Sequence, residues 1–103
     1  MVFRVVWTRK ALEDLRGIKD YISRDSKFYA QIQIERIRSA AAHLGRFPQL
    51  GRAVPEFPDE VWREILTGNY RIIYRLDSEK PQVFVLAVIH GMQLLRDSMI
   101  EPK

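Results

Sequence analysis

The spacing of hydrophobic residues changes along the chain, and the changes divide it into one strand, two helices and three further strands. Residues 2–7 are mostly β-branched or aromatic, which favours a short strand. From Thr8 to about residue 23, and again from about residue 26 to Gly45, hydrophobic residues recur every three or four positions. This period predicts two amphipathic helices, and the short connection between them predicts an antiparallel hairpin.

Local signals mark the ends of both predicted helices. Thr8 can cap the first helix, and Asp25 or Ser26 can cap the second, because their side-chain oxygens accept from free backbone amides. Gly45 stands where a helix commonly ends. The predicted buried stripes are Ala11, Leu12, Leu15, Ile18 and Ile22 in the first helix, and Ala30, Ile34, Ile37, Ala41 and Leu44 in the second.

From residue 61 the hydrophobic period becomes two, which predicts strands at 61–66, 70–76 and 82–90. Gly68 and Asn69 suit a two-residue hairpin turn. The last strand is apolar throughout, so we expect it in the middle of the sheet with both faces covered. The preceding segment, 46–60, holds three of the five prolines and is predicted to be an ordered loop. Its expected apolar anchors are Phe47, Leu50, Val54 and Phe57.

The order of elements predicts an α+β fold of the type β-αα-βββ. We expect a small, twisted, mainly antiparallel sheet with a helical hairpin on one face. The 103 residues suit a single domain, 1–103, in which 92–103 form a short helix or a flexible tail.

A hairpin turn at Gly68 and Asn69 also fixes which residues lie opposite one another in the two flanking strands. The expected pairs are Leu66 with Arg71, Glu64 with Ile73, and Trp62 with Arg75. All six would lie on the face without helices, with Arg75 over the Trp62 ring. This predicted open face has two interpretations: a solvated cluster of charges, or a basic platform for a partner.

Composition restricts the classes of function. The chain has a net charge of +4 and no cysteine, which favours anionic partners and excludes disulfides and thiol chemistry. Its longest apolar run is far shorter than a membrane span, so we expect a soluble, cytoplasmic protein. His43 and His90 stand far apart and the carboxylates are scattered, so we expect no metal site and no cofactor.

Four segments carry a resemblance to a known family. The stretches "WTRKALEDLRGIKDYI", "FPQLGRAVPE", "WREILTGNYRIIYRL" and "VIHG" together resemble the RelE/ParE superfamily of toxins from bacterial type II toxin–antitoxin modules. The resemblance implies the β-αα-βββ fold and a cognate antitoxin bound in a hetero-oligomer. It also implies one of two targets: the ribosome and its mRNA for RelE-like members, or DNA gyrase for ParE-like members.

The residues expected for RNA cleavage form an incomplete set. Arg71 matches the strand arginine of RelE-like members, Arg75 could also hold phosphate, and His90 could transfer a proton. However, Met92 and Gln93 stand where the resemblance implies a basic residue, and no tyrosine follows them. A carboxylate of the loop, Glu56, Asp59 or Glu60, could act as a base only if the loop covered the sheet, and we expect these groups to be solvated. A histidine that ends a buried strand is also commonly a structural hydrogen-bonding group.

The incomplete set favours a ParE-like toxin that inhibits DNA gyrase, is not an enzyme, and is neutralised by an antitoxin. The alternatives are a ribosome-dependent mRNA endoribonuclease and a weakly toxic or inactive member that mainly binds its antitoxin. The residues expected to bind a partner are Trp62, Glu64, Arg71, Arg75, His90 and Arg96.

Overall fold

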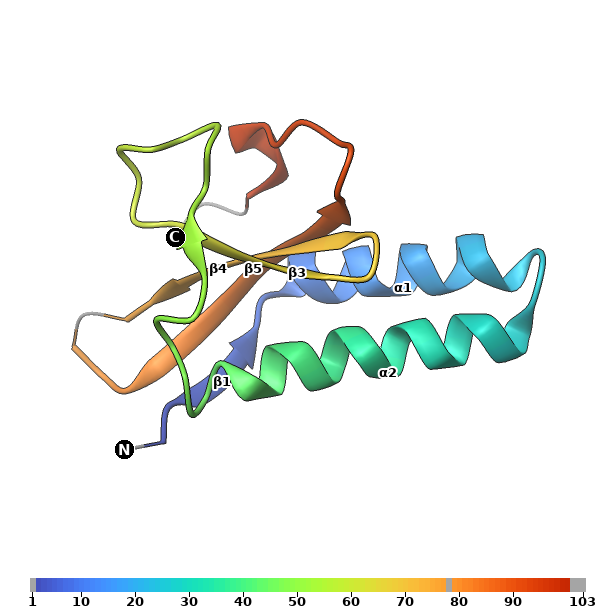
Figure 1. The fold of residues 1–103 in the computed structure, drawn as a ribbon, viewed down its shortest axis with the longest axis horizontal. Helices are drawn as coiled ribbons and strands as arrows, with labels where there is room; N and C mark the ends of the chain where they lie inside the picture. The colour runs from blue at the N-terminus through green and yellow to red at the C-terminus, as the bar shows by residue number, and fades with distance from the viewer. Residues whose placement is uncertain (1, 78, 101–103) are drawn as a thin grey trace.

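The computed structural model describes residues 2–77 and 79–100, and its elements follow the predicted order (Figure 1). They are β1 (Arg4–Trp7), α1 (Arg9–Ser23), α2 (Lys27–His43), β2 (Arg52–Ala53), β3 (Arg63–Thr67), β4 (Tyr70–Leu76), β5 (Gln82–His90) and the short 3₁₀ helix η1 (Asp97–Met99). The α+β fold is confirmed. The two-residue strand β2 is an addition, because so short a pair leaves no period in the sequence.

The two helices begin as predicted. The Thr8 hydroxyl accepts from the amide of Ala11 at 3.2 Å, and the Ser26 hydroxyl accepts from the amide of Tyr29 at 3.0 Å. The Thr8 hydroxyl also donates to the carbonyl of Val85 at 3.0 Å, which ties the start of α1 to β5. The stripe on α1 is narrower than predicted, because Leu12 is 38% exposed. The buried residues of the two helices are Ala11 and Leu15 in α1, and Ala30, Gln33, Ile34, Ile37 and Ala41 in α2.

The five strands form one sheet in the order β1-β5-β4-β3-β2, so β5 lies centrally as predicted. The β1–β5 pair is parallel and the other three pairs are antiparallel. Gly68 has φ +57°, and no other described residue has a positive φ, which fits a type II′ turn. Leu66 lies opposite Arg71 as predicted. The predicted pairing of Trp62 with Arg75 is wrong, because β3 begins only at Arg63.

A β-bulge changes the side to which β5 directs its side chains. Ile73 pairs with Ala87, but the next residue, Tyr74, pairs with Val85, so Leu86 is an extra residue in β5. Before the bulge, Val85 packs with the helices; after it, Ala87 packs on the opposite face. Both faces of β5 are therefore buried, in agreement with its unbroken apolar sequence.

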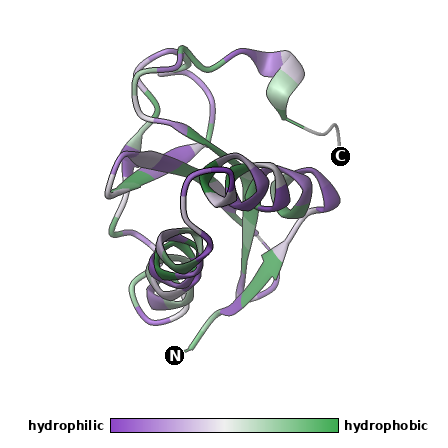
Figure 2. Ribbon diagram, turned by 90° about the vertical axis from the view of Figure 1, so that its right-hand side faces the viewer, coloured by the Kyte–Doolittle hydropathy of each residue, from purple (hydrophilic) through white to green (hydrophobic). Residues whose placement is uncertain are grey.

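The face opposite the helices is covered, so the expectation of an open face is wrong. Figure 1 shows the loop before β3 and the C-terminal segment on the same side of the sheet, and Figure 2 shows this layer apart from the two helices. The residues of this second core are Val54, Ile73, Ala87, Ile89 and Leu95. The loop is anchored by Val54 and by half-buried Phe57, whereas Phe47 and Leu50 are exposed, against expectation. The cover exists because β4 and β5 present apolar side chains on this face too.

Candidate functional site

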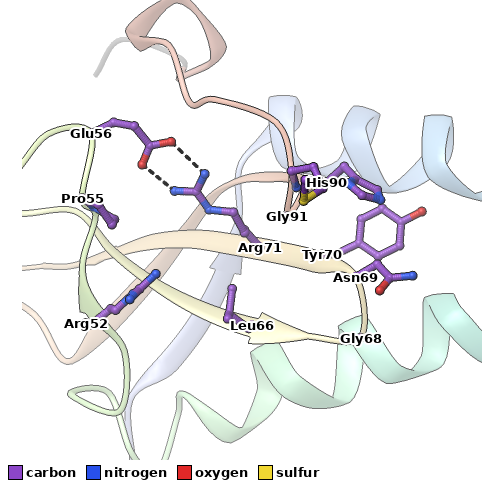
Figure 3. Close-up of a pocket in the computed structure, with 11 residues that line it drawn as sticks. Arg52, Pro55, Glu56, Leu66, Gly68, Asn69, Tyr70, Arg71, His90 and Gly91 are labelled. Carbon is purple, nitrogen blue, oxygen red and sulfur yellow. Dashed lines mark hydrogen bonds and ion pairs between the residues drawn. The ribbon is translucent and has the colours of Figure 1, made fainter.

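Arg71 lies at the centre of the covered face, and each of its five N–H groups has an acceptor. The Nε atom donates to Glu64 Oε1 at 2.8 Å, and Nη1 donates to Glu56 Oε2 at 2.8 Å and to the Gln93 carbonyl at 3.0 Å. The Nη2 atom donates to Glu56 Oε1 at 2.7 Å and to Glu64 Oε1 at 2.5 Å. Figure 3 shows the two-pronged contact with Glu56. The guanidinium therefore has no N–H left for a ligand.

The carboxylates of Glu56 and Glu64 each accept a further hydrogen bond from a donor other than Arg71. Glu64, whose side chain is only 1% exposed, also accepts from Arg52 Nε at 2.8 Å. Glu56 accepts from the amide of Leu95 at 2.7 Å. We call Arg52, Glu56, Glu64 and Arg71 the Arg71 network. Its two arginines and two glutamates cancel in charge, so it presents no net positive field to an anion.

The network shifts the pKa values of its members. The hydrogen bonds from Arg71 lower the pKa of Glu56 from 4.5 to about 2, more strongly than burial raises it. The same bonds to Glu56, and then those to Glu64, raise the pKa of the Arg71 guanidinium. Both groups therefore stay charged across the physiological range, and neither is suited to exchange protons in a reaction.

Three segments of the chain bring the network together. Glu64 on β3 and Arg71 on β4 share a face of the sheet, because Arg71 lies opposite Leu66 and side chains two residues apart in a strand, such as Glu64 and Leu66, point to the same side. Glu56 joins them because Val54 and Phe57, on either side of it, pack on the sheet and carry the loop across. The expectation that Glu56 is solvated is therefore wrong. The signal in the sequence was the apolar pair Val54 and Phe57, because a loop whose apolar residues pack on the sheet on both sides of Glu56 brings that carboxylate to the sheet as well.

A cavity of about 350 Å³ opens beside Arg71, toward the turn between β3 and β4 (Figure 3). Its other wall carries His90, which is exposed, and Tyr70, whose ring centroid lies 5.6 Å from that of His90. The Nδ1 atom of His90 accepts from the amide of Met92 at 3.1 Å, so the neutral ring carries its proton on Nε2. The backbone bond thus fixes the ring of His90, a residue that lines the cavity.

The other residues predicted for the site lie elsewhere. Trp62 packs edge-on against Phe57, with 5.2 Å between ring centroids. Arg75 lies 4.6 Å from the ring centroid of Phe84, so the predicted stacking of Arg75 on Trp62 is wrong. Arg96 is exposed just before η1. Among the predicted residues, the structure joins Glu64 to Arg71 and places His90 across the same cavity. Sequence reasoning missed Arg52 and Tyr70, because β2 and the edge-to-face ring pair leave no period or motif.

Neither a metal site nor a membrane-spanning helix is found among the described residues. No three or more His, Cys, Asp or Glu side chains converge there as a metal ion would need. Within the same ranges, 2–77 and 79–100, no helix has the length and apolarity to cross a membrane.

Several solved structures from toxin–antitoxin systems share this fold. The toxin–antitoxin complex RelBE2 of Mycobacterium tuberculosis matches with a TM-score of 0.66 and 24% identity, over 87% of this chain and 99% of that one. The chromosomal ParDE system of P. aeruginosa matches with a TM-score of 0.72 and 19% identity, over 86% and 96%. A mutant of the E. coli toxin RelE in the free state matches with a TM-score of 0.61 and 20% identity, over 89% and 86%. At these identities the similarity shows the fold alone.

The sequence itself shows the family. Residues 5–95 match the model of the family described as the ParE toxin of the type II toxin–antitoxin system, parDE. The chain belongs to this family and is a type II toxin of the RelE/ParE superfamily, as its resemblance implied. A curated relative, Toxin RelE2 of Caulobacter vibrioides, is 45% identical over 49 residues, which are 48% of this chain and 56% of the relative. The chain thus spans about half the length of that relative.

Proposed function

We propose that the chain is a ParE-like toxin, which inhibits DNA gyrase by binding it and is neutralised by a cognate antitoxin. The family model supports this proposal. The observation that carries it is the full occupation of Arg71, the residue that the resemblance assigns to phosphate in RNA-cleaving members. A toxin that acts by binding needs no free cation at that position.

The cost of freeing Arg71 argues against RNA cleavage. Stabilising a scissile phosphate requires a guanidinium with N–H groups aimed at the developing charge. To supply them, Arg71 would have to leave Glu64, whose side chain is 1% exposed, and Glu56, whose side chain is 14% exposed. Leaving a buried partner unpaired costs about 3–5 kcal/mol. That cost would be added to the barrier of each cleavage reaction.

Inhibition of gyrase is tested in cells and with purified protein. Expression of the chain without its antitoxin should stop DNA synthesis, in pulse labelling, before protein synthesis falls. The purified chain should inhibit supercoiling of a relaxed plasmid by gyrase, and pre-incubation with the antitoxin should restore supercoiling. Normal supercoiling at a large excess of folded chain would overturn the proposal.

One observation favours a second candidate, a RelE-like endoribonuclease that acts on mRNA at the ribosome. It is the 45% identity over 49 residues to a protein named Toxin RelE2. His90→Gln separates the two, because glutamine can keep a hydrogen bond to the amide of Met92 but cannot exchange a proton at neutral pH. An endoribonuclease should lose mRNA cleavage in this variant, whereas a gyrase inhibitor should stay toxic. If expression of the unchanged chain leaves growth normal, the weakly toxic, antitoxin-binding member is the correct interpretation.

A further inference from the structure

Two strongly exposed hydrophobic side chains follow directly after β5. Met92 is 89% exposed and Leu94 is 66% exposed, whereas the next residue, Leu95, is buried in the second core. A third side chain, Leu66 at the end of β3, is 64% exposed and lines the same cavity of about 350 Å³ as Met92 (Figure 3). We call Leu66, Met92 and Leu94 the apolar rim. Exposed apolar side chains gathered beside a cavity are typical of a surface that binds another molecule.

The backbone that carries Met92 and Leu94 is fixed by hydrogen bonds at its start. The amide of Gly91 donates to the carbonyl of Asn69 at 2.7 Å, which ties the chain after β5 to the turn between β3 and β4. The amide of Met92 donates to Nδ1 of His90 at 3.1 Å. The position of the methionine is thus set by two bonds, although its side chain makes little contact with the protein.

The Arg71 network holds the rest of this segment. Arg71 Nη1 donates to the carbonyl of Gln93 at 3.0 Å, and the amide of Leu95 donates to Glu56 Oε2 at 2.7 Å. Leu94 therefore stands between two residues whose backbones are bound to the network. Because the path of the segment is already fixed in the free protein, a partner that binds it has little backbone entropy to remove.

The charge beside the apolar rim restricts the kind of partner. The chain has a net charge of +4, but the two arginines and two glutamates of the Arg71 network cancel, and Arg71 has no N–H left for a ligand. Nucleic acids bind through contacts between their phosphates and free cations. An uncharged apolar surface of a protein, in contrast, gains free energy when it removes the rim from water. The apolar rim therefore suits a protein partner rather than a polyanion.

We propose that Met92 and Leu94 insert into an apolar pocket on DNA gyrase, with Leu66 at the margin of the contact. This inference rests on the proposed function, the inhibition of gyrase. It assigns the contact to a neutral segment rather than to the arginines expected from the sequence. It also gives the Arg71 network a role, because the network fixes the segment that presents the two side chains. Methionine is enriched in protein interfaces, where its unbranched side chain adapts to the partner.

The test compares variants of the purified chain against the gyrase holoenzyme. A double variant, Met92→Ser with Leu94→Ser, should raise the concentration that half-inhibits supercoiling by roughly tenfold or more, because two apolar side chains are lost from the contact. Its affinity for immobilised gyrase, measured by biolayer interferometry, should fall by a similar factor. The fall should be equal at low and at high salt, because salt screens charges and not apolar contacts.

Leu50→Ser is the matched control, because it removes a similarly exposed leucine that does not line the cavity. It should inhibit supercoiling within about twofold of the parent. Circular dichroism verifies that each variant is folded. If the double variant does not fold, Met92→Gln decides, because glutamine keeps the length of the side chain and removes its apolar character.

The outcomes separate the inference from the proposed function. A folded double variant that inhibits gyrase as strongly as the parent overturns the inference and leaves the proposed function intact, whereas a parent that does not inhibit gyrase overturns both. Three results would assign the apolar rim to another occupant and also overturn the inference. They are a loss of affinity for purified antitoxin with unchanged gyrase inhibition, a change from dimer to monomer in light scattering with unchanged inhibition, and a loss of gyrase affinity that disappears at high salt, which would indicate contact with DNA.

Discussion

Replacing Glu56 by glutamine should destabilise the protein in a manner that depends on pH. The substitution keeps the size of the side chain but removes the charge that pairs with Arg71. The pKa of Glu56 is about 2 in the folded protein against an ordinary value of 4.5. At 1.36 kcal/mol for each pKa unit, this difference corresponds to about 3 kcal/mol of stability at neutral pH. The side chain is only 14% exposed, so solvent screening does not reduce this value greatly.

The direction of the pH dependence follows from the lowered pKa. The stabilisation is fully present above about pH 5 and is lost as the pH falls from the ordinary pKa of 4.5 toward 2. Linkage gives a loss of about 1.4 kcal/mol by pH 3.5. The difference between parent and Glu56→Gln should therefore shrink from about 3 kcal/mol at pH 7 to roughly half that at pH 3.5.

Urea denaturation at both pH values, followed by tryptophan fluorescence, measures these free energies of unfolding. The matched control is Glu60→Gln, the same change at an exposed position of the same loop. It should alter stability by less than about 0.5 kcal/mol. If Glu56→Gln behaves like Glu60→Gln at pH 7, or if the difference from the parent is equal at both pH values, the assignment of the network is refuted.

Three further substitutions test other parts of the fold by thermal and urea unfolding. Gly68→Ala should lower the free energy of unfolding by about 1 kcal/mol, because φ is +57° there. A decrease no greater than that caused by a substitution at an exposed helical position would contradict the assignment of the turn. Gly51→Ala should cost about 1–3 kcal/mol, because its Cβ would lie 2.6 Å from the carbonyl oxygen of Glu64; an unchanged stability would show that the loop yields freely. Arg75→Gln should cost about 0.5–1 kcal/mol in the parent but nothing in a Phe84→Leu background, if the guanidinium acts through that ring.

The sequence predicted the elements and the pairing near the turn, because both depend on local patterns. The periods of the two helices and the turn at Gly68 are short-range signals, and they were sufficient to place Leu66 opposite Arg71. The pairing failed at Trp62, where the strand had not yet begun. No local pattern signals the bulge at Leu86, because every residue around it is apolar and suits either face.

The candidate site was predicted in part, for a reason of long-range geometry. The turn at Gly68 and Asn69 placed Arg71 on the face without helices, and that face was expected to be open. Glu56 reaches Arg71 there from 15 positions away in the chain. Its arrival depends on the loop folding over β4 and β5, which follows from their apolar outer faces rather than from any motif. The unbroken apolar sequence of the last strand predicted cover on both of its faces, but it did not show which segment supplies the second cover.

The parallel pairing of β1 with β5 has a consequence for the synthesis of the protein. Arg4 pairs with Gln82, so β1 has no strand beside it until the ribosome has added 78 further residues. At typical rates of translation this takes about 4–16 s. The helical hairpin can form during that interval, whereas the sheet and the cores on its two faces require the completed β5. A nascent chain interrupted before Gln82 should therefore be unable to adopt this fold.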